Sequence, residues 1–246
     1  MAERARTIVT TSWDDGHPLD LRLAELLSDY GVRGTFYFAP RSREREVLEL
    51  ADLRRLAGQF EIGGHTLTHP DLRALDQRNL DDEVAGGKRA VEDAIGRPVE
   101  MFCYPKGRCN ERVRLAVEEA GFIGARTTQL FRFDVPDPFR MPTTLTVKSA
   151  GMAYWLPRAV LSLSGRGLRL LADVDLRIAW LRLARGLFRH AFEHGGVYHL
   201  RGHSWEIEQH AMWNDLEEVL KVITQQEGVA YVTNGELVRM MQAEAG

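Results

Sequence analysis

Four residues in the N-terminal part of the chain could together bind a metal ion and move a proton. Asp14 and Asp15 follow the hydrophobic run 7–10, and His65 and His69 come about fifty residues later. One carboxylate and two imidazoles form a ligand set for a divalent metal that keeps an open coordination position. The second carboxylate is left free to act as a base. The chemistry that these residues indicate is metal-assisted hydrolysis.

Each half of this set also has a simpler explanation. Asp-Gly is a tight-turn signal, so the aspartate pair before Gly16 could be a solvated turn. His65 and His69 could be surface or capping histidines, because Pro70 is a natural first residue of a helix. The buried strand before the aspartates and the two glycines before His65 favour the ligand interpretation.

A regular alternation of strands and helices must position these residues. Such alternation predicts parallel strands with right-handed crossovers, in a doubly wound sheet or a barrel, with sites at the C-terminal ends of the strands. Strands are predicted at 7–13, 35–38, 61–62, 101–104, 122–127, 197–200 and 229–232, and helices at 19–30, 44–57, 80–95, 111–120 and 212–225. The residues at or just after predicted strand ends are Asp14, Asp15, His65, Pro105, Arg126 and His203.

A late strand carries two histidines with different expected roles. His203 follows the end of the strand at 197–200, where a general acid can reach a leaving group. His199 lies within the strand and is expected to be a buried core histidine. Glu206 could orient His203 or begin the next helix.

In this order the motifs resemble those of the polysaccharide deacetylases (carbohydrate esterase family 4). The resemblance implies a deformed (β/α) TIM-like barrel of about seven parallel strands, and hydrolysis of N-acetyl or O-acetyl groups on a sugar or glycan. It runs from about Ile8 to Leu237. The motifs that carry it are Ser12-Trp13-Asp14-Asp15-Gly16, His65-Thr66-Leu67-Thr68-His69, Phe102-Cys103-Tyr104-Pro105-Lys106-Gly107 and the strand-end His203.

The resemblance also implies a role for each matching residue. Asp14 would be the general base and His203 the general acid. Tyr104 would offer its backbone N–H to the oxyanion. The implied metal ligands are Asp15, His65 and His69, usually for zinc, with cobalt or nickel as alternatives; the other candidates on the substrate side are Pro105, Arg126 and Trp205.

Two departures from the family pattern concern groups that support the catalytic residues. The family usually has an arginine where Cys103 stands, and that arginine tethers the base. Arg126 could replace it or could form a structural salt bridge. The aspartate that usually steadies the acid histidine has no clear counterpart, and the candidates are Asp134, Asp137 and Glu206.

The stretch 150–194 departs most from the family and is predicted to be a helical insertion. It is rich in leucine, with Trp155 and Trp180 expected to turn inward. Its arginines either cover a solvated helix face or form a lid or basic surface for an anionic or lipid-linked substrate, with peripheral membrane contact. On the second interpretation Arg182 and Arg185 would bind substrate. The arginines are Arg158, Arg166, Arg169, Arg177, Arg182, Arg185 and Arg189.

Composition excludes several other classes of protein. The 246 residues, 44% of them hydrophobic, fit one domain over 1–246. A net charge of -3 gives no basic field for nucleic acid, and Cys103 and Cys109 are too few for a disulfide scaffold. No apolar run reaches the roughly 18 residues of a transmembrane helix, and no signal region precedes the first strand, so a cytoplasmic location is expected.

Two other functions use the same residues. A non-haem iron oxygenase can hold its metal with one carboxylate and two histidines. The strand–helix alternation and the spare carboxylate of Asp14 argue against it. A non-catalytic carbohydrate-binding relic of the fold would explain the missing arginine at Cys103, but the candidate base, acid and metal ligands are all present.

Overall fold

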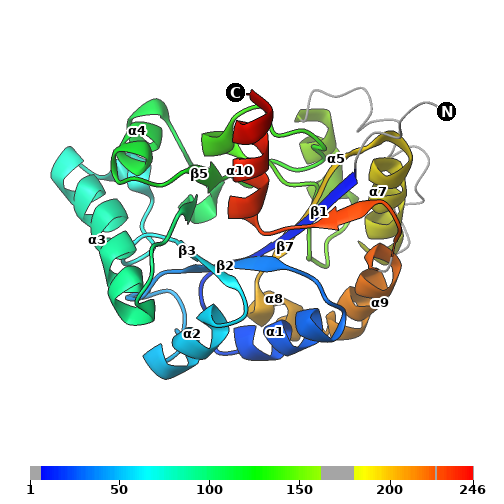
Figure 1. Cartoon of the computed structure of the whole chain (residues 1–246), viewed down its shortest axis with the longest axis horizontal. Helices are drawn as coiled ribbons and strands as arrows, with labels where there is room; N and C mark the ends of the chain where they lie inside the picture. The colour runs from blue at the N-terminus through cyan, green and yellow to red at the C-terminus, as the bar shows by residue number, and fades with distance from the viewer. Residues whose placement is uncertain (1–6, 162–179, 225, 246) are drawn as a thin grey trace.

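The computed structural model describes residues 7–161, 180–224 and 226–245. Within them, eight strands form one parallel sheet (Figure 1). Seven of them follow the order β5-β4-β3-β2-β1-β7-β6, and the eighth, β8, pairs with the first residues of β1, whose last residues pair with β2. The strands are β1 (Thr7–Trp13), β2 (Gly34–Phe38), β3 (Glu61–Gly64), β4 (Met101–Cys103), β5 (Gly124–Arg126), β6 (Leu145–Thr146), β7 (Gly196–Gly202) and β8 (Val229–Tyr231).

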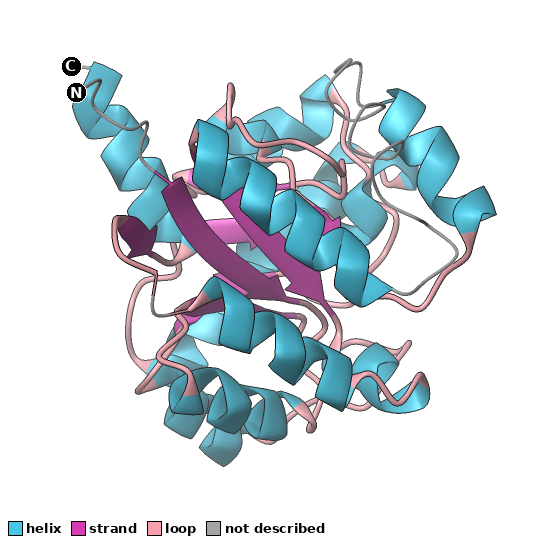
Figure 2. Cartoon of the chain, turned by 90° about the vertical axis from the view of Figure 1, so that its right-hand side faces the viewer, coloured by secondary structure: helices cyan, strands magenta, loops and turns pink. Residues whose placement is uncertain are grey.

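Helices surround this sheet, as Figure 2 shows. The α-helices are α1 (Asp20–Asp29), α2 (Leu50–Ala57), α3 (Gln77–Ile95), α4 (Glu111–Glu119), α5 (Met152–Leu161), α7 (Trp180–His194), α8 (Ser204–Gln209), α9 (Trp213–Ile223) and α10 (Asn234–Ala245), and short 3-10 turns are η1 (Leu72–Ala74), η2 (Pro105–Gly107) and η3 (Pro138–Arg140).

The sheet curls into a deformed barrel because one segment contacts both of its edges. Met141 pairs with Arg126 of β5, and a few residues later β6 pairs with β7 at Leu145 and Thr146. The predicted fold class, a deformed barrel of parallel strands and helices, is confirmed. An eighth strand, the two-residue β6, was not predicted from the sequence.

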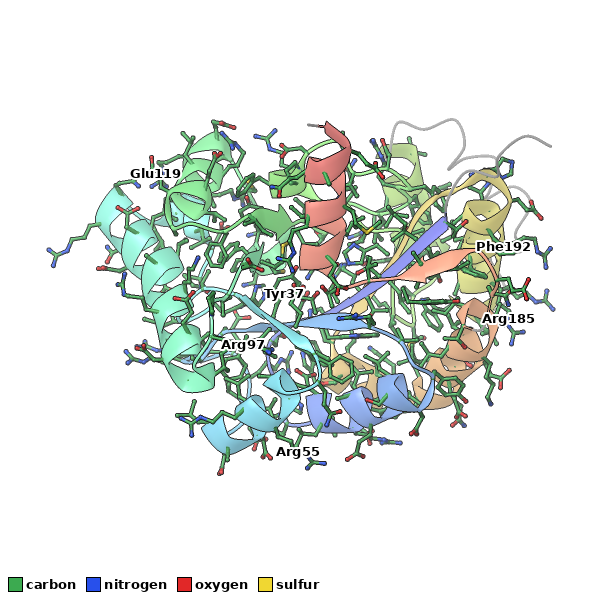
Figure 3. All side chains as sticks on the ribbon, viewed as in Figure 1. Tyr37, Arg55, Arg97, Glu119, Arg185 and Phe192 are labelled. Carbon is green, nitrogen blue, oxygen red and sulfur yellow. The ribbon has the colours of Figure 1, made fainter. Side chains whose placement is uncertain are left out.

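The barrel has a small interior core that is closed by α10. Asn234, at the start of this helix, accepts a hydrogen bond from Thr10 and donates to Tyr37, at 2.9 and 2.8 Å. Tyr37 is fully buried among the strands (Figure 3). The side chains packed together there are Tyr37, Met101, Cys103, Met141, Val197, Leu237 and Val238. Cys103 of this core contacts Arg126 of β5, which joins the core to the residues at the strand ends.

One predicted helix is shorter than expected. The prediction of a helix over 44–57 is wrong for its first six residues, because α2 begins at Leu50. The chain before it is a loop whose Leu48 is buried in the core and donates its N–H to the carbonyl of Gly16 at 2.8 Å. Those tertiary contacts hold the segment next to the aspartate motif and prevent the helical conformation.

The insertion forms α5 and α7 in the residues that the structure describes. Trp155 and Trp180 are buried, as predicted. Among the arginines, Arg166, Arg169 and Arg177 lie outside the described residues. No helix in the described part of the chain is both long and apolar enough to cross a bilayer.

Candidate active site

A cavity of about 380 Å³ opens at the C-terminal ends of the strands, where the sequence predicted the site. This volume lies near the lower end of the range for small-molecule pockets. The residues that line it are Asp14, Asp15, Glu44, Arg45, His65, His69, Tyr104, Lys106, Thr128, Tyr154, Arg158, Arg201, His203 and Trp205.

Asp15, His65 and His69 converge in this cavity as predicted. One donor atom from each side chain lies within 4.8 Å of the others. Asp15 Oδ1 is 3.6 Å from His65 Nε2 and 3.7 Å from His69 Nε2. Ligands bonded to one ion at about 2.0–2.2 Å are separated by distances of this order. The three side chains are buried, so the donor set and its spacing fit a divalent metal.

Neighbouring groups contact each of the three donors. His65 Nδ1 donates to the carbonyl of Cys103 at 2.7 Å, so its Nε2 lone pair faces Asp15. Burial, together with His69, lowers the pKa of His65 to about 4, which keeps the imidazole neutral. The indole of Trp205 donates to Asp15 Oδ2 at 2.9 Å. The Glu44 carboxylate lies 3.1 Å from His69 Nδ1.

The backbone at these ligands adopts a conformation that side chains usually avoid. Asp15, Thr66 and His69 have φ of 82°, 68° and 65°. Non-glycine residues in this left-handed region cost about 1–3 kcal/mol each and gather at functional sites. The Thr66 hydroxyl accepts the N–H of His69 at 2.9 Å, which fixes the conformation of the loop.

Arg126 reaches the candidate base, which settles one alternative left by the sequence. It is fully buried and donates to Asp14 Oδ1 in a short contact. Burial alone would raise the pKa of Asp14, but the surrounding positive charges, of which the Arg126 guanidinium is the largest, together outweigh it, and the pKa falls well below its ordinary value. Arg126 and Cys103 are register partners on adjacent strands, and the guanidinium lies 2.8 Å from the Cys103 sulfur. Arg126 therefore contacts Asp14 from the strand beside the one that carries Cys103.

His203 lies on the other side of Asp14, with Nε2 at 3.7 Å from Asp14 Oδ2. Its Nδ1 donates to Glu206 Oε2 at 3.2 Å, and Glu206 also pairs closely with Lys148. Although burial opposes it, the hydrogen bonds from His203 and Lys148 lower the pKa of Glu206 to about 2. Glu206 both orients His203 and lies in the next helix, α8.

The other two candidates for orienting the histidine are occupied elsewhere. Asp134 pairs with Arg132 at 2.6 Å. Asp137 accepts the N–H of Phe139 at 2.8 Å at the start of η3. His199 is buried in the strand and hydrogen-bonds Ser12 through Nε2 at 2.9 Å, as expected of a core histidine.

The remaining substrate-side predictions have mixed outcomes. Trp205 and Tyr104 line the cavity. The prediction that the Tyr104 N–H is offered to an oxyanion is not supported, because this N–H already donates to the Arg126 carbonyl at 3.2 Å. Pro105 is buried and does not line the cavity. Arg126 lies behind Asp14, so it contacts the base and not the cavity.

Two supporting residues were missed by sequence reasoning. Glu83 of α3 accepts the N–H groups of Leu67 and Thr68 at 3.0 and 2.9 Å, and so anchors the histidine loop. Arg201, near the end of β7, is buried with its guanidinium 3.9 Å from Asp14. A charged residue in an otherwise buried strand was the available signal for Arg201. No local pattern marks Glu83.

Comparison with known proteins places this site in a family. The model of the polysaccharide deacetylase family matches residues 2–125, half of the chain, and includes both the aspartate pair and the histidine loop. The chain belongs to this family. The second half of this polysaccharide deacetylase homologue, with His203 and the insertion, lies beyond the matched region.

Curated relatives share only part of their length with this chain. Chitin deacetylase 1 of Cryptococcus neoformans is 28% identical over 111 residues, which are 45% of this chain and 23% of that protein. The peptidoglycan-N-acetylglucosamine deacetylase of Bacillus cereus is 26% identical over 117 residues, 47% of this chain and 54% of that protein. The chain thus spans about half or less of the length of these relatives.

A solved structure extends the likeness to the whole fold. A polysaccharide deacetylase homologue from Mycobacterium smegmatis superposes with a TM-score of 0.70 at 16% identity, covering 100% of this chain and 93% of that one. At this identity the likeness establishes the fold alone.

Proposed function

We propose that this protein is a metal-dependent hydrolase that removes acetyl groups from an N-acetylated or O-acetylated sugar. The observation that carries the proposal is the convergence in one cavity of the Asp15, His65 and His69 donors with Asp14 and His203. Membership of the polysaccharide deacetylase family supports the same reaction class.

Asp15, His65 and His69 would hold the metal ion. Zinc fits this nitrogen and oxygen donor set best, and cobalt and nickel accept similar ligands. When bound, such an ion supplies a water of lowered pKa and polarises the acyl oxygen. The neutral state of His65 and the hydrogen bond from Trp205 to Asp15 keep the two donors aimed at one point.

Asp14 is proposed to accept the proton of the attacking water. Because Arg126 holds Oδ1, the other oxygen, Oδ2, is the one that faces His203 and the cavity. The lowered pKa keeps this carboxylate ionised at neutral pH. A carboxylate of low pKa is a weak base, so it takes a proton only from a water that has itself been acidified.

His203 is proposed to protonate the departing amine or alcohol. The Glu206 carboxylate accepts the Nδ1 proton and fixes the ring with Nε2 toward Asp14. Asp14 and His203 thus line the same cavity as the proposed acceptor and donor of protons. Lys148 balances the charge of Glu206.

Acetate release tests this function directly. The protein would be incubated with N-acetylated and O-acetylated sugars in the presence of zinc, cobalt or nickel, and free acetate and bound metal would both be measured. We expect Asp14→Asn to abolish turnover and to retain the metal, because Asp14 is not a ligand. Near-normal turnover by this variant with full metal occupancy would exclude Asp14 as the base. Oxygen consumption with bound iron and no acetate would favour the oxygenase.

A further inference from the structure

The cavity has more positive charge than the proposed hydrolysis needs. Its basic side chains are Arg45, Lys106, Arg158 and Arg201. Lys106 is paired with Glu44 at 2.9 Å. In the described part of the chain, Arg45 and Arg158 pair with no carboxylate, and Arg201 has only a long contact to Asp14 at 3.9 Å. Three guanidinium groups at one cavity therefore lack a close anionic partner.

Arg201 is the most informative of the three because it is buried. It is only 7% exposed, and its Nε has no hydrogen-bond partner among the residues that the structure describes. Within the described ranges, the carboxylate that comes within 4.0 Å of it is that of Asp14, which Arg126 already holds more closely. A buried cation without a close partner costs free energy, so its presence in a cavity wall indicates that a ligand completes its interactions.

Aromatic rings hold the other two arginines in place. Arg158 of α5 lies over the ring of Tyr154, and Arg45 lies over the ring of Trp205, each with 3.7 Å between the guanidinium carbon and the ring centre. Both rings line the cavity. Stacking orders a guanidinium while its N–H groups stay available for an oxyanion. The three arginines come from the loop before α2, from α5 and from β7, and they meet only at this cavity.

We propose that the cavity binds an acylated sugar that carries a phosphate or carboxylate group, held by Arg158 and Arg201 with Arg45 at the rim. This inference rests on the proposed deacetylase function and specifies its substrate class. Arginine forks match the paired oxygens of both anions. The two arginines that the sequence suggested, Arg182 and Arg185, do not line the cavity; Arg185 pairs with Glu218 of α9 on the outer edge (Figure 3).

Steady-state kinetics of the zinc-loaded enzyme test the proposal. The substrates are N-acetylglucosamine and a chitin oligosaccharide as neutral sugars, N-acetylglucosamine 1-phosphate and 6-phosphate, and N-acetylmuramic acid as a carboxylate. We expect kcat/KM to be about tenfold or more higher for at least one anionic sugar, mainly through KM. Comparison of the phosphorylated sugars with N-acetylmuramic acid identifies which anion, phosphate or carboxylate, is recognised.

Two variants separate a specific subsite from a general charge effect. Arg158→Gln should reduce the preference for the anionic sugar about tenfold. Arg182→Gln removes an exposed arginine of α7 outside the cavity and should leave that preference unchanged. Equal kcat/KM for neutral and anionic sugars, or an equal loss with both variants, would overturn the subsite.

Calorimetry distinguishes failure of this inference from failure of the proposed function. Binding of the same sugars to zinc-loaded enzyme needs no turnover. If no sugar releases acetate but the anionic sugar binds more tightly and Arg158→Gln weakens it, the subsite stands and the deacetylase proposal fails. If acetate is released and binding shows no preference for the anion, the function stands and the subsite fails.

Discussion

Asp14 has a different partner on each of its two oxygens, and this asymmetry decides what the residue can do. Oδ1 is held by Arg126, while Oδ2 faces His203 and Arg201. A carboxylate with one anchored oxygen keeps its other oxygen in a fixed direction, as a base must. Arg126 is therefore the residue that would fix the direction of the proposed base. Sequence reasoning could name Arg126 but could not choose its role, because the contact depends on the register of β5 against β4.

The anchoring role of Arg126 can be tested by moving the guanidinium to the adjacent strand. Arg126→Ala should lower kcat/KM at least about tenfold and destabilise the fold by about 3–5 kcal/mol, because it leaves the buried Asp14 charge unpaired. Adding Cys103→Arg should restore part of the lost activity and part of the lost stability, since Cys103 is the register partner of Arg126 on the adjacent strand. Acetate release and thermal unfolding measure the two effects.

The control for this rescue is Cys103→Arg alone, which places a second guanidinium beside Arg126 and should destabilise the protein. If the double variant is no better than Arg126→Ala, the guanidinium is not interchangeable between the two strands, and the anchoring role is refuted.

At the scale of elements, the histidine loop depends on α3 passing very close to it. A Cβ added to Gly87 would lie 2.5 Å from the backbone carbon of Thr66, whereas a Cβ on the adjacent Gly86 would meet nothing closer than 3.9 Å. Glu83, one turn earlier, accepts hydrogen bonds from the same loop. Helix α3 therefore fixes the position of the histidine loop through two contacts, the close packing of Gly87 and the hydrogen bonds to Glu83.

This close contact predicts opposite effects for two neighbouring glycines. Gly87→Ala should displace the loop and weaken metal affinity roughly 10–100-fold, the usual effect of disturbing groups behind metal ligands. Gly86→Ala should keep the affinity and stabilise α3 by about 0.5–1 kcal/mol through lower chain entropy. Calorimetric titration with the metal compares the metal affinities of the two variants, and thermal unfolding compares their stabilities. Equal metal affinity in the two variants would contradict the role given to α3.

The elements that could be predicted are those specified by local sequence. Asp14, His65 and His203 were placed correctly because each directly follows a hydrophobic strand. The loop before α2 was predicted as helix because its charged residues favour helix, while its actual contacts, from Glu44 to Lys106 and from Arg45 to Trp205, join distant parts of the chain. Single-sequence patterns do not contain such contacts.

At the scale of the whole molecule, burial of a carboxyl group links folding to pH. Asp20 begins α1 and is fully buried. Burial raises its pKa well above the ordinary value, and neither carboxyl oxygen has a hydrogen-bond partner among the described residues. The folded protein therefore holds this proton more tightly than the unfolded chain does. The contribution to stability is complete below about pH 3.9 and is lost as the pH rises through the folded pKa.

Asp20→Asn removes this proton equilibrium with little change of shape. Relative to the wild type, the variant should gain stability as the pH rises from 4 to 8, by up to about 1.4 kcal/mol per pH unit in the range between the two pKa values. Denaturant unfolding at a series of pH values measures the difference, and subtraction cancels the titration of all other groups. Parallel stability curves for the two proteins would show that Asp20 is ionised in the folded state.

The pairing of Cys103 with Arg126 has a consequence for how this fold can evolve. Register partners on parallel strands lie about 4.8 Å apart, a distance that a long arginine side chain easily spans. Selection then acts on where the guanidinium lies in the folded protein, and not on which sequence position carries the arginine. If Arg126 anchors the base as we propose, either position of such a pair can carry the arginine. A comparison made one alignment column at a time would score both as variable, and would classify a chain with cysteine at the first position as inactive.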